Sequence, residues 1–586
     1  MTDQAQQPPP VEKRTGSGQV VRVNGPLVEV EGLDQVAVLD VVEVGHAGLA
    51  AEVVSVRRGL VTAQLYEYTG GLRVGDPAVG RGHPLSARLG PGLLGGIFDG
   101  LLRPLAGRPR WLTPGSLQQV GDERRWPFLP SVSAGSVVGP GDILGTVPTT
   151  SGVDHRVLVP AGVSGRVEWV TDHDEVGDDE PIAVVAGQEL AVTEVCPVRA
   201  PRLMRTRLEL SAPLLTGQRV VDLLFPIAKG GAAAVPGGFG TGKTVLLQQL
   251  VKWCEADVIV FVGCGERGNE LADALADLAD LEDPRTGRSL LHRTVVIANT
   301  SNMPVMAREA SIHTGMTVAE FYRDMGYDAV LLADSTSRWA EALREFSSRN
   351  GELPAEEGYP AGLASALATF YERAGRVITL GGKEGSVTAI GAVSPPGGDM
   401  TEPVTAHTER FVRCLWSLDR DLAYARHYPA ITWRRSFSRD AQVVGAWHAS
   451  SGRPGWARDR ARAIALLAEA DRLAPMVDLV GLSALPGRER MVMLGGRLFR
   501  EAVLQQRAQS ANDGTCTPEK QAALLDLVLA VFDRCMALIE DGHPASVVEE
   551  FDFSGVIRVS NEVGPSDATG VERRRDEVLS SLESLA

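Results

Sequence analysis

The chain has 586 residues and a formal net charge of −16 at pH 7, and 44% of its residues are hydrophobic. This length predicts three or four domains, and the composition is that of a folded globular protein. The acidic excess argues against a nucleic-acid-binding protein, whose working face is usually basic. The six cysteines form no C-x-x-C pair and lie far apart, so we expect a protein of the reducing cytoplasm. No apolar run approaches the roughly 20 residues that span a bilayer, so we expect the protein to be peripheral to any membrane and to reach it through partners.

The first 200 residues predict β structure in two parts. After a polar tail of residues 1–18, which we expect to be disordered, residues 19–88 contain short β-branched runs separated by turn signals such as Asn24-Gly25-Pro26. This pattern is typical of a small N-terminal β-barrel. Residues 89–200 are rich in glycine and proline, with alternating stretches such as 155–159. We interpret them as a separate, inserted β-rich domain; the alternative is a set of long loops that belong to the barrel.

The pattern becomes α/β in residues 201–440. Apolar strands such as 329–333 alternate there with amphipathic helical segments, which predicts a largely parallel sheet. Residues 441–586 are rich in alanine, leucine and arginine, and the runs 457–474 and 518–539 predict long helices. The expected fold is therefore multidomain, with a central α/β nucleotide-binding domain followed by a C-terminal helical bundle.

One segment of the α/β region matches the phosphate-binding pattern G-x-x-x-x-G-K-[ST]. Its residues, with the one that follows, are Gly237, Gly238, Phe239, Gly240, Thr241, Gly242, Lys243, Thr244 and Val245. The glycines let backbone N–H groups surround phosphate oxygens, Lys243 reaches the β- and γ-phosphates, and the Thr244 hydroxyl can bind Mg²⁺. An apolar strand precedes the loop and a helix follows it, so the phosphates would lie at a helix N-terminus. We therefore expect ATP or ADP with Mg²⁺; the alternative is a glycine-rich loop that matches by chance.

Glu266 and Arg267 directly follow an apolar strand, at the strand end where α/β sheets bind ligands. Glu266 is a candidate for orienting and deprotonating an attacking water, and Arg267 for balancing charge nearby. The alternative is a salt bridge on a surface loop.

Two further candidates lie later in the chain. Asp334 ends the strand 329–333, where enzymes with a phosphate loop commonly place the carboxylate of the Mg²⁺ shell. Its alternative role is the N-cap of the next helix. Tyr428 offers a flat ring for stacking on adenine, and packing in the core is its alternative.

Several longer stretches show a resemblance to one family. They are residues 89–94, 97–100, 215–219, 225–231, 263–270, 299–304, 333–344, 393–399 and 504–506. Together they resemble the catalytic A subunit of V-type and archaeal-type (V/A) rotary ATPases over nearly the whole chain past the tail. The resemblance implies a β-barrel, an inserted domain, a RecA-like nucleotide domain and a helical bundle.

The resemblance also implies partners and residue roles. It implies an alternating A3B3 ring with a B subunit that supplies an arginine finger in trans, central and peripheral stalks, and a separate membrane sector that conducts protons or sodium ions. Nucleic acid has no place in it. By position, Lys243 and Thr244 bind phosphate and Mg²⁺, Glu266 activates water, Arg267 lies beside the phosphates and Asp334 supports the metal.

Some positions depart from the family pattern. Gly238 replaces a usual proline and Thr241 a usual serine, so we expect a looser loop without a disulfide switch. Residues 507–509 read Arg-Ala-Gln where the family commonly has Asn-Ala-Phe, so an aromatic contact to adenine is lost or replaced, and Ala366 replaces a residue that is often basic. None of these changes removes a residue that handles phosphate or water, so activity is expected.

Two other classes of protein remain to be weighed. A homohexameric secretion ATPase or a Rho-like RNA translocase shares a related core, but residues 89–200 and the acidic charge argue against both. A non-catalytic nucleotide-binding subunit would not need a carboxylate such as Glu266 for activating water.

Overall fold

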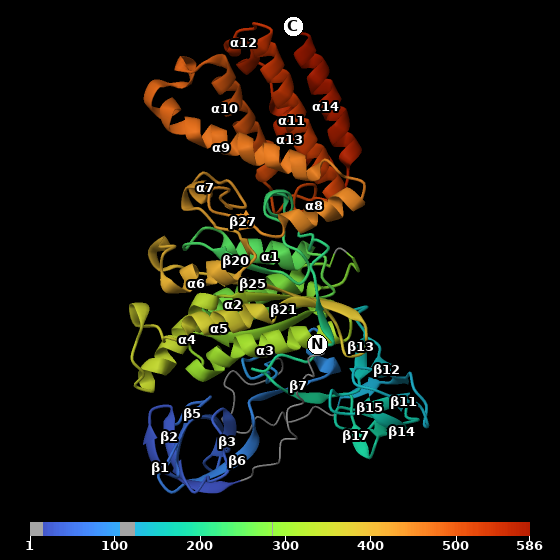
Figure 1. The fold of residues 1–586 in the computed structure, drawn as a ribbon, viewed down its shortest axis with the longest axis vertical. Coiled ribbons are helices and arrows are strands. Elements are labelled where there is room, and N and C mark those ends of the chain that lie inside the picture. Colours follow the sequence, from blue (N-terminus) through green and yellow to red (C-terminus); the bar gives the residue numbers. More distant parts are fainter. Residues whose placement is uncertain (1–15, 106–123, 150, 284, 586) are drawn as a thin grey trace, which may run out of the picture.

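The computed structural model describes residues 16–105, 124–149, 151–283 and 285–585, and four regions follow one another in it (Figure 1). The barrel and the inserted domain lie at one end of the long axis, the nucleotide domain in the middle and the helical domain at the other end. Residues 1–15 of the predicted tail lie outside the described residues. The first strand begins at Ser17, within the range predicted as tail.

The N-terminal region is a closed six-stranded barrel, as predicted. Its strand order is β1-β2-β5-β4-β3-β6. Gly25 has φ +58° in the turn between β1 and β2, which explains the turn signal in the sequence. Valine, leucine and alanine side chains from alternate positions fill the interior. The strands are β1 (Ser17–Asn24), β2 (Leu27–Glu31), β3 (Asp40–Val44), β4 (Leu49–Arg57), β5 (Leu60–Leu65) and β6 (Pro77–Pro84).

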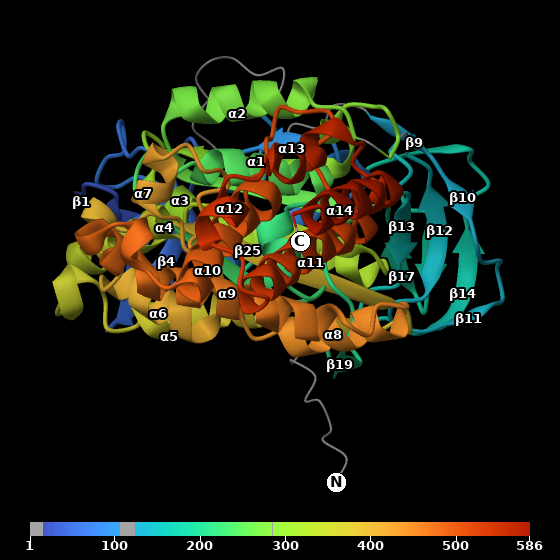
Figure 2. The ribbon, with the colours of Figure 1, turned by 90° about the horizontal axis from the view of Figure 1, so that it is seen from above.

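The inserted β-rich domain has a hydrophobic core of its own, built around residues such as Phe128, Leu144 and Val167. It is therefore a separate domain rather than a set of barrel loops, and it projects to one side of the molecule (Figure 2). The chain enters through β7 and leaves through β18, which pair antiparallel. Its strands are β7 (Ser86–Leu89), β9 (Arg125–Pro127), β10 (Leu129–Pro130), β11 (Val137–Val138), β12 (Ile143–Val147), β13 (His155–Leu158), β14 (Gly165–Val170), β15 (Glu175–Gly177), β16 (Ala183–Val185), β17 (Gln188–Leu190) and β18 (Glu194–Pro197).

The central sheet has ten strands and is largely parallel, as predicted. Its main path runs β27-β26-β20-β25-β23-β21-β22-β8, and β24 and β19 extend from β25. Residues 97–98 form β8 and pair parallel with β22, so a short piece of the range predicted as insertion belongs to this sheet. The strands are β8 (Ile97–Phe98), β19 (Thr206–Leu208), β20 (Ala232–Pro236), β21 (Val258–Glu266), β22 (Thr294–Thr300), β23 (Asp328–Asp334), β24 (Gly375–Ile378), β25 (Glu384–Val393), β26 (Cys414–Leu415) and β27 (Phe437–Ser438).

Helices cover both faces of this sheet. Along β21, Ile259 and Phe261 belong to one core and Val260 and Val262 to the other, because successive side chains of a strand point to opposite faces. The first core includes α1 and α2, and the second includes α3, α4 and α5 and reaches the barrel. The helices are α1 (Lys243–Trp253), α2 (Gly268–Asp280), α3 (Val305–Asp324), α4 (Thr336–Arg349), α5 (Leu363–Glu372), α6 (Pro403–Phe411) and α7 (Arg420–Tyr424).

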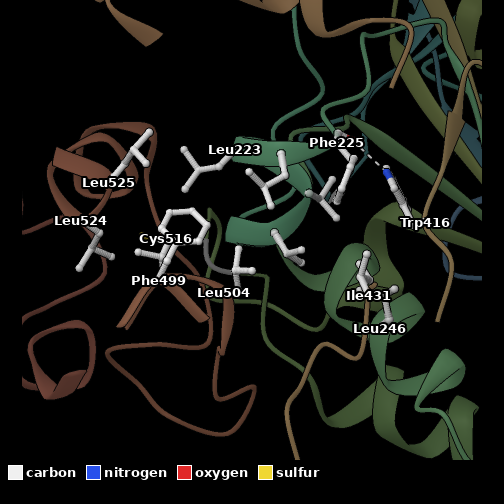
Figure 3. Packing of buried hydrophobic residues seen from close by; sticks show 14 of the residues in the cluster. Leu223, Phe225, Leu246, Trp416, Ile431, Phe499, Leu504, Cys516, Leu524 and Leu525 are labelled. Carbon is white, nitrogen blue, oxygen red and sulfur yellow. Dashed lines mark hydrogen bonds between the residues drawn. The ribbon is translucent and has the colours of Figure 1, made fainter. Parts of the chain in front are cut away.

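The C-terminal region is helical, as predicted, and shares one continuous core with the nucleotide domain. Figure 3 shows Phe225 of the nucleotide domain and Leu504 of the helical domain within this core, and the indole N–H of Trp416 donates to the Phe225 carbonyl oxygen at 2.9 Å. No helix among the described residues is long and apolar enough to cross a membrane. The helices are α8 (Ala441–Ser450), α9 (Trp456–Val480), α10 (Gly487–Phe499), α11 (Pro518–Glu540), α12 (Ala545–Glu549), α13 (Ser554–Glu562) and α14 (Ala568–Glu583), with a π-helical turn at Arg500–Leu504.

Candidate active site

The predicted phosphate loop connects β20 to α1 at the carboxyl end of the strand. Gly240 and Gly242 have φ of +78° and +87°, a region that residues with a side chain rarely adopt. A β-carbon on Gly237 would lie only 2.8 Å from Leu418 Cβ. The backbone conformation and the close packing therefore require glycine at these positions. The first N–H groups of α1 have no partner within the helix and can bind an anion.

The other loop positions differ in exposure. The Thr241 side chain is buried and its hydroxyl donates to the Gly238 carbonyl oxygen at 2.8 Å, which braces the loop from inside. Thr244 is exposed at the start of α1, and the Phe239 and Val245 side chains are 87% and 51% exposed. These three side chains face outward, where a nucleotide or a neighbouring chain can reach them.

Lys243 is held inside the loop by protein oxygens. Its Nζ atom donates to the Gly237 carbonyl oxygen at 2.8 Å, to the Val393 carbonyl oxygen at 3.2 Å and to the Ser394 hydroxyl. Burial lowers the pKa of Lys243, and the carboxylates of Asp334 and Glu266 oppose that shift. The ammonium group therefore lies near both predicted carboxylates, and phosphate oxygens can replace its present acceptors.

Glu266 and Asp334 are brought together by two neighbouring parallel strands, β21 and β23, of which each is the last residue. Burial raises the pKa of Asp334 to about 6, and the Lys243 charge opposes this rise. Burial also raises the pKa of Glu266 to about 7, with a further contribution from Asp334. The N-cap of α4 is Ser335, whose side chain makes no cap hydrogen bond, and Asp334 itself belongs to the strand.

The donor set at this place suits Mg²⁺. The buried Asp334 carboxylate and the Thr244 hydroxyl are hard oxygen donors, which Mg²⁺ prefers, and Mg²⁺ in nucleotide enzymes takes its remaining ligands from phosphate and water. Among the described residues no cluster of three or more histidine, cysteine or acidic side chains could hold a metal by itself. The site thus fits an ion that arrives with the nucleotide.

Two arginines, Arg267 and Arg338, belong to the segments that follow β21 and β23. Arg267 immediately precedes α2, its side chain is 69% exposed, and its Nη1 atom lies 3.7 Å from Oε1 of Glu270. The charges of Arg338 and, to a smaller extent, Lys243 lower the Glu266 pKa, against the larger effect of burial. Sequence reasoning did not assign Arg338, although it lies four residues after Asp334, a spacing that places it one helical turn from that strand end.

Tyr428 lines a cavity of about 650 Å³ between the phosphate loop and the helical domain. Its side chain is 43% exposed, so the ring is not packed in the core. Val245 and residues 505–510 line the same cavity, including the Arg507-Ala508-Gln509 departure from the family pattern. Arg426, two residues before Tyr428, and Asn561, which only the folded chain brings to the loop, also line the cavity and were not predicted.

Four known domain families match the chain in order. The beta-barrel domain of the ATP synthase alpha/beta family matches residues 20–82, and the barrel-sandwich domain of ATP synthase alpha/beta subunits matches 117–199. The nucleotide-binding domain of the ATP synthase alpha/beta family matches 217–438, and the C-terminal domain of V and A type ATP synthases matches 445–548. The matches cover all four regions of the fold.

Several related proteins match this chain over nearly its full length. The V-type ATP synthase alpha chain of Nitrosococcus oceani is 49% identical over 539 residues, which is 90% of this chain and 91% of that one. The A subunit of the A-type ATP synthase of Methanopyrus kandleri is 46% identical, over 96% and 98% of the two chains. The V-type ATP synthase alpha chain of Thermoanaerobacter pseudethanolicus is also 46% identical, over 97% and 98%.

A solved structure shares the fold at low identity. The assembled ATPase EscN from the type III secretion system of enteropathogenic E. coli superposes with a TM-score of 0.64 and 22% identity. The match covers 87% of this chain and all of that one. At this identity the likeness concerns the fold alone.

Proposed function

The chain belongs to the family of V-type ATP synthase alpha chains and A-type ATP synthase A subunits, and we propose from its site that it is their catalytic subunit. It hydrolyses or forms ATP, and the complex couples this reaction to the movement of protons or sodium ions across a membrane. The observation that carries the proposal is the meeting of Lys243, Glu266 and Asp334 at adjoining strand ends beside the phosphate loop. The near full-length relatives set the secretion ATPase and RNA translocase aside.

The phosphate loop binds the triphosphate. The N–H groups at the start of α1 and the Lys243 ammonium contact the phosphate oxygens, and Asp334 and Thr244 hold Mg²⁺. Mg²⁺ bound with ATP supplies positive charge against the β- and γ-phosphates. The low dielectric that shifts the pKa values of Asp334 and Lys243 also strengthens these attractions.

Glu266 handles the water. Its raised pKa, about 7, makes the carboxylate a better proton acceptor than an exposed glutamate, and general bases work best when their pKa lies near the operating pH. Arg338 stabilises the ionised form of Glu266, and Arg267 supplies a second positive charge at the start of α2. In the direction of synthesis, the same group returns the proton.

The base lies in the cavity beyond the loop. Tyr428 lines it with a partly exposed ring, and Val245 supplies an apolar contact on the side of α1. A flat aromatic face binds a purine by stacking, which is worth about 1–3 kcal/mol for a base.

A second chain completes the site. Phe239, Thr244 and Val245 are exposed on the loop, so one side of the bound nucleotide is left to a neighbour. We assign that neighbour as a B subunit in an alternating A3B3 ring. Its arginine finger stabilises the transition-state charge, a contribution of about 10³ to 10⁵ in rate.

The helical domain offers a surface for the central stalk. At the end of α9, the Leu479 and Val480 side chains are 84% and 60% exposed, with Met476 and Leu482 beside them in sequence at 43% and 37%. Grouped exposed apolar side chains mark interaction surfaces. The central stalk takes this contact, peripheral stalk subunits hold the ring, and the membrane is reached only through the ion-conducting sector, so this chain stays in the cytoplasm.

Purification of the native complex tests the proposal. We expect stalk subunits to co-purify together with a B subunit, and ATP hydrolysis by the complex that far exceeds hydrolysis by the isolated chain. Assays with and without sodium identify the coupling ion. Fast turnover by the isolated monomer would contradict a site shared between chains.

A further inference from the structure

The buried side chain of Arg219 attaches the wall of the base cavity to the nucleotide domain at three points. This side chain is fully buried, and Arg219 lies between β19 and the π-helical turn Val220–Leu224. Its Nε atom donates to the Val503 carbonyl oxygen at 2.6 Å, and Nη2 donates to the Gln505 carbonyl oxygen at 2.5 Å. Its Nη1 atom forms an ion pair with Asp513.

Asp513 links the buried Arg219 side chain to the backbone of Arg507. One carboxylate oxygen of Asp513 faces the Arg219 guanidinium, and the other accepts a hydrogen bond from the Arg507 backbone N–H at 2.8 Å. Asp513 is almost completely buried, so neither bond competes with bulk water. The pair thus fixes the backbone on which the Arg507 side chain stands.

Gln506 ties the same segment to Tyr428 and to the nucleotide domain. Its backbone N–H donates to the Tyr428 carbonyl oxygen at 2.7 Å. Its side-chain oxygen accepts from the Arg219 N–H at 2.9 Å, and its side-chain nitrogen donates to the Gly217 carbonyl oxygen at 2.9 Å. The two walls of the cavity, at Tyr428 and at residues 505–507, are therefore joined at a fixed spacing.

The Arg507 side chain is available to contact a ligand. It is exposed, it lines the cavity, and within the described part of the chain it makes no hydrogen bond or ion pair. A guanidinium plane stacks on a flat ring and donates in its own plane, so it can contact a purine held by Tyr428. We propose that Arg219 and Asp513 are positioning residues that hold Arg507 against the base, and that Arg507 is a contact residue for the base.

This inference rests on the proposed nucleotide site, and it makes a claim about the base alone. A ligand that has the phosphates but lacks the base contacts the loop and not residues 505–510. Inorganic tripolyphosphate with Mg²⁺ is such a ligand. Loss of the positioning pair should therefore weaken ATP without weakening tripolyphosphate.

The test uses the assembled complex with Asp513→Asn in this chain. Asparagine keeps the size of the side chain and can keep an oxygen toward Arg219, but the amide nitrogen then faces the Arg507 N–H and cannot accept its hydrogen bond. We expect the KM for MgATP to rise about tenfold, the loss of one charge-assisted hydrogen bond, with kcat within about twofold. The inhibition constant of Mg-tripolyphosphate should stay unchanged.

Two further variants complete the design. Arg507→Ala alone should raise the KM for ATP. The double variant with Asp513→Asn should have a KM little higher than that of Arg507→Ala, because both substitutions remove the same contact between Arg507 and the base. Glu549→Gln is the matched control, since it removes the partner of Arg490 in the helical domain away from the cavity. It should leave the KM for ATP unchanged even if it lowers the melting temperature.

The outcomes separate the possibilities. A KM for ATP that is unchanged in Arg507→Ala, or a rise in the tripolyphosphate constant parallel to that for ATP in Asp513→Asn, overturns the positioning role. If the complex with Asp513→Asn does not assemble, Arg219→Lys takes its place, because lysine keeps the buried charge but lacks the forked N–H groups of the guanidinium. The KM for ATP and the inhibition constant of tripolyphosphate are then compared in that variant. Absence of ATP hydrolysis by the unsubstituted complex would instead overturn the proposed function.

Discussion

The ring of Tyr428 lies against Gly242, the last glycine of the phosphate loop. A β-carbon on Gly242 would lie 3.4 Å from Cε1 of Tyr428 and 3.6 Å from Cδ1. The base cavity therefore begins where the phosphate site ends, and one ring borders both. The chain thus has separate elements for the triphosphate and for the base, which can be tested separately.

Tyr428→Ala should weaken ATP binding and leave the phosphate site intact. Loss of one stacked base contact costs about 1–3 kcal/mol, so the KM for ATP should rise by about 10- to 100-fold. Tyr428→Phe keeps the ring and should stay within about twofold of the parent. Steady-state kinetics of the assembled complex check this, and equal effects of the two substitutions would contradict stacking.

Gly238 and Gly240 should respond differently to alanine. Gly240 has φ +78°, so Gly240→Ala places a side chain in the left-handed region at a cost of about 1–2 kcal/mol. Gly238 is outside that region, and its β-carbon would meet the flexible end of Arg420 at 3.2 Å and the Gly398 Cα at an ordinary contact distance of 3.9 Å. Gly238→Ala should therefore be tolerated and should stabilise the loop by about 0.4–1 kcal/mol through the unfolded chain.

Thermal unfolding and ATP affinity measured on the two glycine variants decide this prediction. The Gly240 variant should lose affinity for ATP, while the Gly238 variant keeps it. If both variants bind ATP equally well, the loop does not need the conformation seen here.

The sequence was most informative where function depends on neighbouring residues. The phosphate loop could be predicted because strand, glycines, Lys243 and helix are contiguous. Glu266 and Asp334 could be placed at one sheet edge because the carboxyl ends of parallel strands meet there. The barrel and the helical domain followed from residue periodicity, which reflects burial on one face.

What the sequence could not provide were contacts between distant segments. Ser394 reaches Lys243 across 151 positions, and Arg219 reaches Asp513 across 294. No local pattern encodes such a pair. Residues 97–98 were assigned to the insertion because a two-residue strand at a sheet edge has no periodicity of its own. The catalytic role of Arg267 stays a prediction, and its exposed side chain contrasts with the position of Arg338 beside Glu266.

The inserted domain should lose stability as the pH falls below 6.5. His155 on β13 is buried, and burial lowers its pKa to about 4, while its bond to the Val192 carbonyl oxygen opposes the shift. Between pH 6.5 and 4 the unfolded chain takes up a proton that the folded chain does not. Stability is therefore full above pH 6.5 and falls by about 1 kcal/mol between pH 7.5 and 5.5.

Urea unfolding at pH 7.5 and 5.5, followed by tryptophan fluorescence, measures this loss. His155→Gln should reduce the difference between the two pH values. His46→Gln, at a side chain that is 85% exposed, is the matched control and should leave the difference as in the parent. A difference that persists in full in His155→Gln would assign the loss to other groups.

The central claim is that Glu266 activates water at a nucleotide site completed in the assembled ring. The direct measurement is ATP binding and turnover by the complex carrying Glu266→Gln, which keeps the shape of the side chain and removes the base. We predict ATP affinity within about threefold of the parent and turnover lower by about 10²- to 10⁴-fold, the contribution of a general base. Turnover at the parent rate would contradict the assignment of Glu266.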